Sequence, residues 1–236
     1  GKNATVVFAD ADLQSAVEGA VRAAFTNSGQ VCLCGSRIFV EEKISKQFKH
    51  LFVERVSAIK IGNPMDEATE MGTVISPEHL LKVESYIHLA EQEGGIILAG
   101  GTREMTGYNG PEGIGAFLRP TVVDNLPYTS RCATEEIFGP MVTLHSFTSE
   151  QEALRMVNFS EYGLAGSVWT SDLERGERFS SQIDSGIVWV NTWLHRDLRT
   201  PFGGVKNSGV GREGGQWSLD FFSELTNICI KDSDGN

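Results

Sequence analysis

A cysteine bracketed by glycines has the residue type and setting for covalent chemistry. The stretch GQVCLCG at residues 29–35, which contains Cys32 and Cys34, lies between a predicted helix and a predicted strand. Glycines permit close backbone approach, so the thiol of Cys32 could be an exposed nucleophile once it is ionised. A free cysteine is more often a small buried hydrophobe, and the loop by itself leaves both interpretations open.

Two further segments combine residue types that could bind ligands. The run EEIFGP at 135–140 offers the Glu136 carboxylate to sugar hydroxyls and the Phe138 ring to a planar group. Its alternative is a solvated acidic turn before a strand. The run PFGGVKNSGVGREGG at 201–215 is rich in glycine, but it is a weak match to a phosphate-binding loop because no strand leads directly into a helix there.

The composition limits the possible partners. The 236 residues carry a formal net charge of −11, which repels polyanions, so nucleic acid and anionic membranes are poor partners. We see neither an apolar run long enough to span a bilayer nor a signal peptide, and therefore expect a cytoplasmic protein. Four cysteines and five histidines show no disulfide framework and no zinc-ligand spacing, so no metal is expected.

Alternating strands and helices must position these segments. Strands are predicted at TVVFAD, SRIFVE, IILAG, MVTLHSF, LAGSVWT and IVWVN. Between them, apolar residues recur at helical spacing at about residues 13–25, 44–59, 77–93, 149–159 and 173–183. This rhythm predicts an α/β fold, in which helices cover a mainly parallel sheet with right-handed crossovers.

Two stretches depart from the alternation. Residues 101–115 carry no apolar period, which predicts an exposed excursion within the domain. The apolar FFSELTNICI near the C-terminus predicts a strand that either completes its own sheet or pairs with another chain. One principal domain with a C-terminal appendage is the simplest division.

Taken together, the three segments and their order resemble the aldehyde dehydrogenase superfamily. GKNATVVFADADL, GQVCLCGSR, EEIFGP, YGLAGSVWT, GIVWVN and PFGGVKNSGVGREGG all match, over essentially the whole chain. The resemblance implies a catalytic domain at 1–215 and a C-terminal segment with an oligomerisation strand at 216–236. It also implies a homo-oligomer, a dimer or tetramer in the intact parent.

The resemblance assigns roles to individual residues. The family oxidises aldehydes with NAD or NADP, NAD being favoured here, through a cysteine thiohemiacetal and thioester. Cys32 matches the nucleophile, with Cys34 supporting it. Glu136 matches the carboxylate on the nicotinamide ribose, Phe138 the ring beside the nicotinamide, and Lys82 a residue near the adenosine. Glu213 matches a proton-relaying carboxylate, whose alternative is an ordinary loop carboxylate.

The segment WLHRDLR at 193–199 narrows the substrate. Many family members have an apolar residue where Arg196 falls, on the wall of the aldehyde tunnel that Phe202 would also line. A guanidinium there can bind a carboxylate through two hydrogen bonds. The segment is similar to the branch that acts on 2-hydroxymuconic and 2-aminomuconic semialdehydes. The alternative is a surface ion pair of Arg196 with Asp197 or a glutamate.

The resemblance also places parts of the family's machinery outside the given sequence. Gly1 and Lys2 match the end of a Glu-Leu-Gly-Gly-Lys motif, so the general base would precede Gly1, as would the NAD-binding domain. The isolated chain is then expected to be a fragment with impaired dehydrogenase activity. A non-catalytic assembly fragment and a residual thiol esterase are the alternatives.

Overall fold

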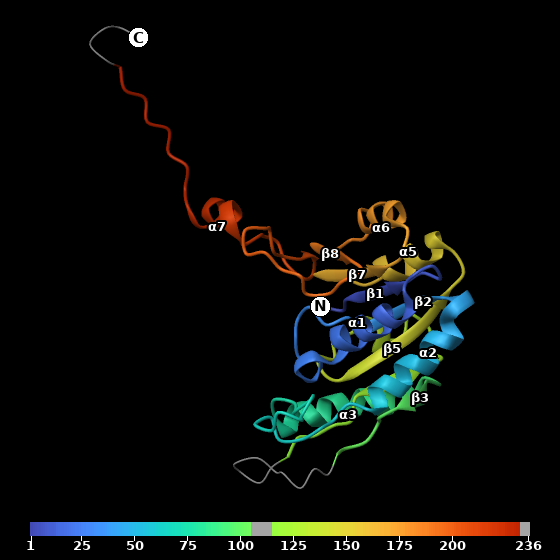
Figure 1. Ribbon diagram of the computed structural model, residues 1–236. Coiled ribbons are helices and arrows are strands. Elements are labelled where there is room, and N and C mark those ends of the chain that lie inside the picture. The colour runs from blue at the N-terminus through green and yellow to red at the C-terminus, as the bar shows by residue number, and fades with distance from the viewer. Residues whose placement is uncertain (105–114, 232–236) are drawn as a thin grey trace.

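The computed structural model describes residues 1–104 and 115–231 and contains a twisted seven-stranded sheet (Figure 1). The strand order is β3-β4-β5-β2-β1-β7-β8. The strands are β1 (Ala4–Val7), β2 (Arg37–Glu41), β3 (Ile96–Ala99), β4 (Thr121–Asp124), β5 (Met141–Phe147), β7 (Ala165–Trp169) and β8 (Ile187–Val190). All neighbours pair in parallel except β3, which lies antiparallel on β4 at one edge. The α/β fold predicted from the sequence is confirmed.

Strand β1 lies in the interior of the sheet and is buried on both faces. Its Val6 is in register with Phe39 of β2 and with Val168 of β7. All four residues of β1 are buried, as expected for a strand of a parallel sheet that helices cover on both sides. The continuous apolar run that predicted this strand thus reflects its burial in the interior of the sheet.

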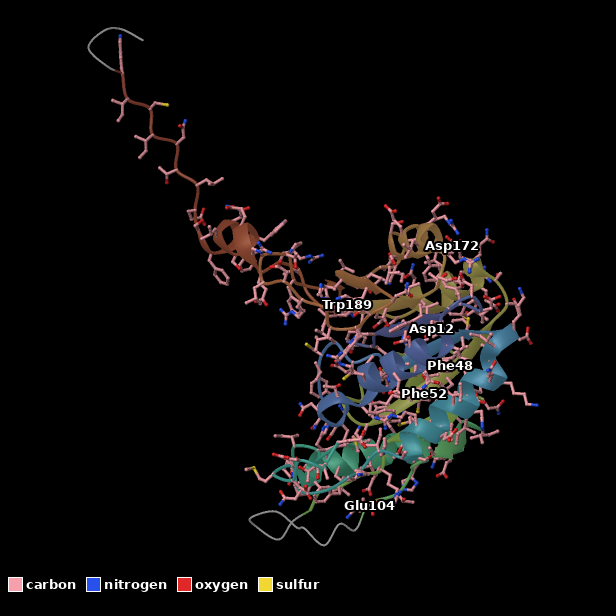
Figure 2. The ribbon with its side chains drawn as sticks, in the orientation of Figure 1. Asp12, Phe48, Phe52, Glu104, Asp172 and Trp189 are labelled. Carbon is pink, nitrogen blue, oxygen red and sulfur yellow. The ribbon has the colours of Figure 1, made fainter. Side chains whose placement is uncertain are left out.

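Two helices cover one face of the sheet. Asp12 caps the N-terminus of helix α1 (Leu13–Phe25), because its side chain accepts a hydrogen bond from the Ser15 N–H. Helix α2 (Glu42–Ser57) packs Phe48 and Phe52 against the same apolar cluster (Figure 2). Because every second strand residue points to this face, Val7 of β1 belongs to this cluster.

Three helices cover the opposite face. These are α3 (Pro77–Gln92), α5 (Glu150–Asn158) and α6 (Leu173–Ser180). Asp172 caps α6 by accepting from the Arg175 N–H (Figure 2). Val6 of β1 packs here with residues of α5 and α6, while α3 packs over Val123 and Met141 near the β3 edge.

Several short elements were not predicted from the sequence. They are the 3-10 turn η1 (Thr26–Gly29), the single-turn α4 (Arg131–Thr134), and a two-stranded ribbon of β6 (Tyr162–Gly163) and β9 (Val205–Lys206). Asn27 and Ser28 in η1 have positive φ angles. Such conformations carry no hydrophobic period and are stabilised by tertiary contacts, so the sequence pattern gives no sign of them.

The C-terminal part differs from its prediction. Phe221 and Phe222, expected to begin a strand, lie in helix α7 (Gly215–Phe222), and residues 223–231 pair with no described strand of this chain. The segment extends away from the α/β body (Figure 1), and Leu225 is 98% exposed. A strand needs a neighbouring strand to satisfy its backbone, and the described part of the body offers none here.

Most of the predicted excursion at 101–115 lies outside the described residues. Among the described residues, no helix is both long and apolar enough to cross a membrane.

Candidate active site

Three of the predicted site residues, Cys32, Glu136 and Phe138, converge at the end of the sheet where the parallel strands begin, whereas Lys82 and Glu213 do not line this cleft. The cysteine loop leads into β2 and the EEIFGP run leads into β5. Parallel neighbours start at the same edge, so these two loops meet although they are about 100 residues apart. Cys32, Glu136 and Phe138 line one narrow cleft there, together with Gly1 and Gly29 among others.

The two cysteines of the loop have different environments. Cys32 is exposed to solvent, whereas Cys34 is 7% exposed. Burial raises the pKa of the Cys34 thiol to about 11, so this group stays protonated at neutral pH. Because the thiolate is the reactive form, Cys32 carries the more accessible thiol of the pair for such chemistry.

Glycine packing brings the two loops together. Gly29 has φ of +70°, and a Cβ built on it would lie 2.3 Å from the Gly139 carbonyl oxygen. A Cβ on Gly139 would in turn lie 2.5 Å from a methyl group of Val83 in α3. Only residues without side chains allow the end of η1, the EEIFGP run and α3 to stack this closely.

One side of helix α3 holds the EEIFGP run through three side chains. His79 Nε2 lies 2.6 Å from the Phe138 carbonyl oxygen, and Lys82 Nζ donates to the Glu136 carbonyl at 3.2 Å. Tyr86 Oη donates to the Glu135 carboxylate at 2.6 Å. Lys82, expected near a cofactor adenosine, thus contacts the backbone of the EEIFGP run. His79 and Tyr86 were missed, although their spacing with Lys82 on one helix face was visible.

With the run held in this way, the Glu136 carboxylate and the Phe138 ring lie at the cleft. The side chain of Glu136 is 34% exposed at this cleft. Phe138 is 38% exposed and adopts a left-handed backbone with φ of +60°. A bulky residue in this conformation is strained, and such strain persists where surrounding contacts over-determine the geometry.

Arg196, Phe202 and Glu213 line a second small cleft. The Arg196 guanidinium carbon lies 4.5 Å from the centroid of the Phe202 ring. The backbones of Phe202 and Glu213 exchange two hydrogen bonds of 2.8 Å, and the Glu213 side chain faces solvent. Asp197, the alternative partner of Arg196, is instead bound by Arg199, whose Nε lies 2.9 Å from its Oδ1.

An apolar cluster joins the two clefts. Trp193 is 4% exposed, and its Nε1 donates to the Leu33 carbonyl at 3.0 Å. Phe202 packs against the same cluster, which includes Leu33 and Val31 on either side of Cys32. The segment that carries Arg196 therefore packs against the cysteine loop through Trp193.

Two buried cations, Lys2 and Arg37, follow the cleft residues Gly1 and Ser36 directly in the chain. Arg37 donates to the backbone carbonyls of Lys2, Met156 and Val157, and burial lowers the pKa of Arg37 to about 9. Burial, and secondarily the Arg37 charge, lowers the pKa of Lys2 to about 7. These groups were not singled out in the sequence because charged residues are usually exposed.

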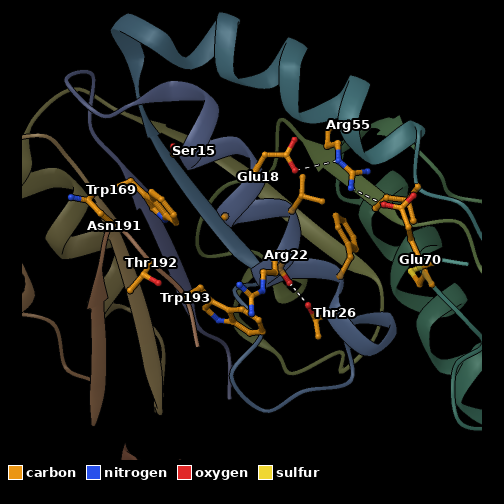
Figure 3. Close-up of a pocket in the computed structure, with 15 residues that line it drawn as sticks. Ser15, Glu18, Arg22, Thr26, Arg55, Glu70, Trp169, Asn191, Thr192 and Trp193 are labelled. Atoms are coloured by element: carbon orange, nitrogen blue, oxygen red, sulfur yellow. Dashed lines mark hydrogen bonds and ion pairs between the residues drawn. The ribbon is translucent and has the colours of Figure 1, made fainter. Parts of the chain in front are cut away.

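A separate cavity lies on the α1 side of the sheet, with a volume of about 660 Å³ (Figure 3). Its wall carries an ion-pair chain in which Arg55 bridges Glu18 at 3.3 Å and Glu70 at 2.7 Å. Arg22 lies 5.9 Å from the ring centroid of Trp193 at the other end. None of the predicted site residues lines this cavity.

The donor set offers no metal-binding arrangement among the residues the structure describes. No group of three or more His, Cys, Asp or Glu side chains there could hold an ion.

Fold and site together define an α/β enzyme domain with a cysteine-containing cleft, and sequence comparison gives its family. The aldehyde dehydrogenase family model matches residues 1–228. The chain therefore belongs to the aldehyde dehydrogenase family, as its motifs predicted.

Individual relatives refine the comparison. A 2-aminomuconic 6-semialdehyde dehydrogenase from Pseudomonas sp is 48% identical, and a 2-hydroxymuconic semialdehyde dehydrogenase from Pseudomonas putida is 46% identical. Each alignment covers 98% of this chain and 47% of the relative. The chain thus spans about half the length of the curated relatives it matches.

Solved structures share the fold. The crystal structure of HpcC from Thermus thermophilus superposes with a TM-score of 0.92 at 44% identity, over 97% of this chain and 44% of that one. A betaine aldehyde dehydrogenase from Staphylococcus aureus in complex with NAD+ gives a TM-score of 0.89 at 41% identity, over 94% and 43%.

Proposed function

We propose that this chain is the catalytic portion of an NAD-dependent dehydrogenase that oxidises a carboxylated semialdehyde to the acid. The observation that carries the proposal is the cleft shared by exposed Cys32, Glu136 and Phe138. Semialdehyde dehydrogenases among the relatives support the substrate class. We propose residues 1–215 as the catalytic domain and residues 216–236 as a segment that joins subunits of a homo-oligomer.

In this mechanism the Cys32 thiolate attacks the aldehyde carbon. The C–S bond forms as the carbonyl π electrons move to oxygen, and the Cys32 backbone N–H stabilises that oxyanion. Among the described residues none accepts a hydrogen bond from this N–H, so it is free to donate. Loss of hydride from the carbon leaves a thioester on Cys32. Water then hydrolyses the thioester, releases the acid and regenerates the thiol.

Glu136 and Phe138 fit the nicotinamide end of the cofactor. An exposed carboxylate can accept hydrogen bonds from ribose hydroxyls, and an exposed ring can pack on a planar ring. NAD supplies the hydride acceptor when it is bound. Glu213, exposed beside Phe202, is proposed to relay a proton toward the hydrolytic water.

Arg196 is proposed to bind the distal carboxylate of the substrate. Among the described residues no carboxylate forms an ion pair with it, since its neighbour Asp197 is bound by Arg199. Stacking on Phe202 orients the guanidinium and leaves its N–H groups available. A free guanidinium in a cleft suits two-point binding of a carboxylate.

Cys32 is tested first on this chain with p-nitrophenyl acetate, since acylation needs no hydride acceptor. We expect a burst of p-nitrophenol and an acetyl group on Cys32 in peptide mass spectrometry. Cys32→Ala should abolish the burst, while Cys229→Ala, at the other exposed cysteine, should preserve it. A burst that survives Cys32→Ala would overturn the assignment. A folded chain without any burst would favour the assembly-fragment alternative.

Substrate class is tested on a protein that contains this chain within a complete dehydrogenase. Arg196→Ala should raise KM about tenfold or more for an aldehyde with a distal carboxylate, because a charged hydrogen-bonded pair is lost. KM for a neutral aldehyde should change little. Equal changes for both aldehydes would indicate a structural role for Arg196.

A further inference from the structure

The four backbone carbonyls of residues 31–34, the turn that carries the proposed nucleophile, all accept hydrogen bonds. The Cys34 N–H donates to the Val31 carbonyl at 2.9 Å, which closes a turn with Cys32 and Leu33 at its centre. Trp193 Nε1 binds the Leu33 carbonyl at 3.0 Å. The two remaining carbonyls, those of Cys32 and Cys34, are bound by one side chain, Asn3.

The side-chain amide of Asn3 binds both this turn and the start of β7. Its Nδ2 donates to the Cys32 carbonyl at 2.8 Å and to the Cys34 carbonyl at 2.9 Å. Its Oδ1 accepts from the Ala165 N–H at 3.0 Å, just where β7 begins. Asn3 itself precedes β1 and is 4% exposed. The amide thus fixes the turn to two strands of the sheet.

Both cysteines line the cleft, and they differ in which thiol the register held by Asn3 leaves exposed to solvent. With both carbonyls bound, Cys32 is exposed and Cys34 is buried, where its Sγ lies 3.8 Å from the Thr26 carbonyl oxygen. A turn released from Asn3 loses two hydrogen bonds and keeps those of the Leu33 carbonyl to Trp193 and of the Gly35 N–H to the Ala23 carbonyl, so its backbone can rotate more freely. Rotation would exchange the environments of the two side chains.

We propose that Asn3 is a positioning residue that determines which cysteine of the Cys32–Cys34 pair is presented as the nucleophile. The inference extends the proposed function and rests on it, because it takes Cys32 as the reacting group. It assigns to the polar residue before β1 a role in selecting between two thiols of the same loop.

The four cysteines of this chain provide the test. Iodoacetamide labelling followed by peptide mass spectrometry reports each thiol separately. Cys229 is exposed in the C-terminal segment and serves as the reference for reagent reactivity, while Cys132 is 0% exposed and reports opening of the whole fold. In the unaltered chain we expect Cys32 to be labelled and Cys34 to be protected.

Asn3→Asp keeps an oxygen that can accept from the Ala165 N–H. It removes the N–H groups that donate to the Cys32 and Cys34 carbonyls. We expect Cys34 labelling, relative to Cys229, to rise at least tenfold, with Cys132 still protected. Asn3→Ser, which restores at most one donor and adds no charge, should give a smaller rise and covers the case in which Asn3→Asp does not fold. Asn191→Asp is the matched control, since it removes a comparable amide bond to the Thr170 carbonyl without touching the turn.

Protection of Cys34 in folded Asn3→Asp and Asn3→Ser would overturn the inference. A parallel rise at Cys34 and Cys132 would do so too, because it would show general destabilisation. The proposed function fails by a different result, the survival of the acetate burst in Cys32→Ala, so the two failures are distinguishable.

Discussion

The two clefts of this molecule are built in opposite ways. The Cys32 cleft rests on loops that enter interior strands, with Lys2 and Asn3 buried beneath it at 2% and 4% exposure. The Arg196 cleft lies in a surface segment where Arg196 and Glu213 are exposed. Covalent chemistry needs atoms held to within a fraction of an ångström, whereas recognition of a charged group tolerates change in a loop. Perturbing the first cleft should therefore change stability strongly, and perturbing the second should not.

The largest effect on stability is expected from Lys2→Met. The pKa of Lys2 is about 7 in the fold and 10.5 in a free side chain, so between these values the unfolded chain binds the extra proton. Stability consequently rises with pH from about 7 to 10.5 and is lowest below pH 7. Removing the ammonium group should stabilise the protein at pH 6 by roughly 4 kcal/mol.

This prediction is checked by urea denaturation from pH 6 to pH 10. The difference between Lys2→Met and the unaltered chain isolates Lys2, because the remaining groups cancel. The gain should shrink as the pH rises. A gain that does not depend on pH would show that Lys2 titrates normally.

Gly29→Ala should have the next largest effect. The new methyl group would meet the Gly139 carbonyl at 2.3 Å in a left-handed backbone, so we expect a loss of about 3 kcal/mol in the free energy of unfolding. Gly94→Ala is the control, because Gly94 also has positive φ but nothing lies within 4 Å. It should lose only about 1 kcal/mol. If Gly29→Ala and Gly94→Ala lost equal free energy of unfolding in urea, the close packing of Gly29 against Gly139 would not contribute to stability.

Tyr86→Phe should have a moderate effect. It removes the 2.6 Å hydrogen bond to Glu135 and should lower the free energy of unfolding by roughly 1 kcal/mol. Cys32 labelling by iodoacetamide should stay unchanged, since Tyr86 contacts the EEIFGP run and not the cysteine turn. A slower Cys32 reaction would show that the two loops move as one unit.

The smallest effect is expected from Arg196→Ala. Its stacking on Phe202 is an exposed contact, and its loss should change the free energy of unfolding by about 0.5 kcal/mol or less. Thermal unfolding with Arg199→Ala as the companion variant checks this. If Arg196→Ala lowered the free energy of unfolding as much as Gly29→Ala does, the two clefts would contribute equally to stability, contrary to the comparison above.

Much of the architecture could be predicted because it is written in local patterns. The apolar runs of β1, β2, β5, β7 and β8 are strands of the sheet, and the helices lie near the ranges that their apolar spacing predicted. The site prediction also rested on local runs of residues, at Cys32 and at Glu136. The residues that hold those runs, Asn3, His79 and Tyr86, were missed, since each acts on a loop distant in sequence.

The sequence by itself determined the elements, the family and the candidate nucleophile, because periodicity and motifs are properties of neighbouring residues. It did not determine that β3 is antiparallel, that Phe221 and Phe222 are helical, or that Asp197 pairs with Arg199. Nor did it distinguish Cys32 from Cys34 by environment. Only the tertiary structure decided these points, since pairing, burial and hydrogen bonding depend on which distant segments the sheet brings together.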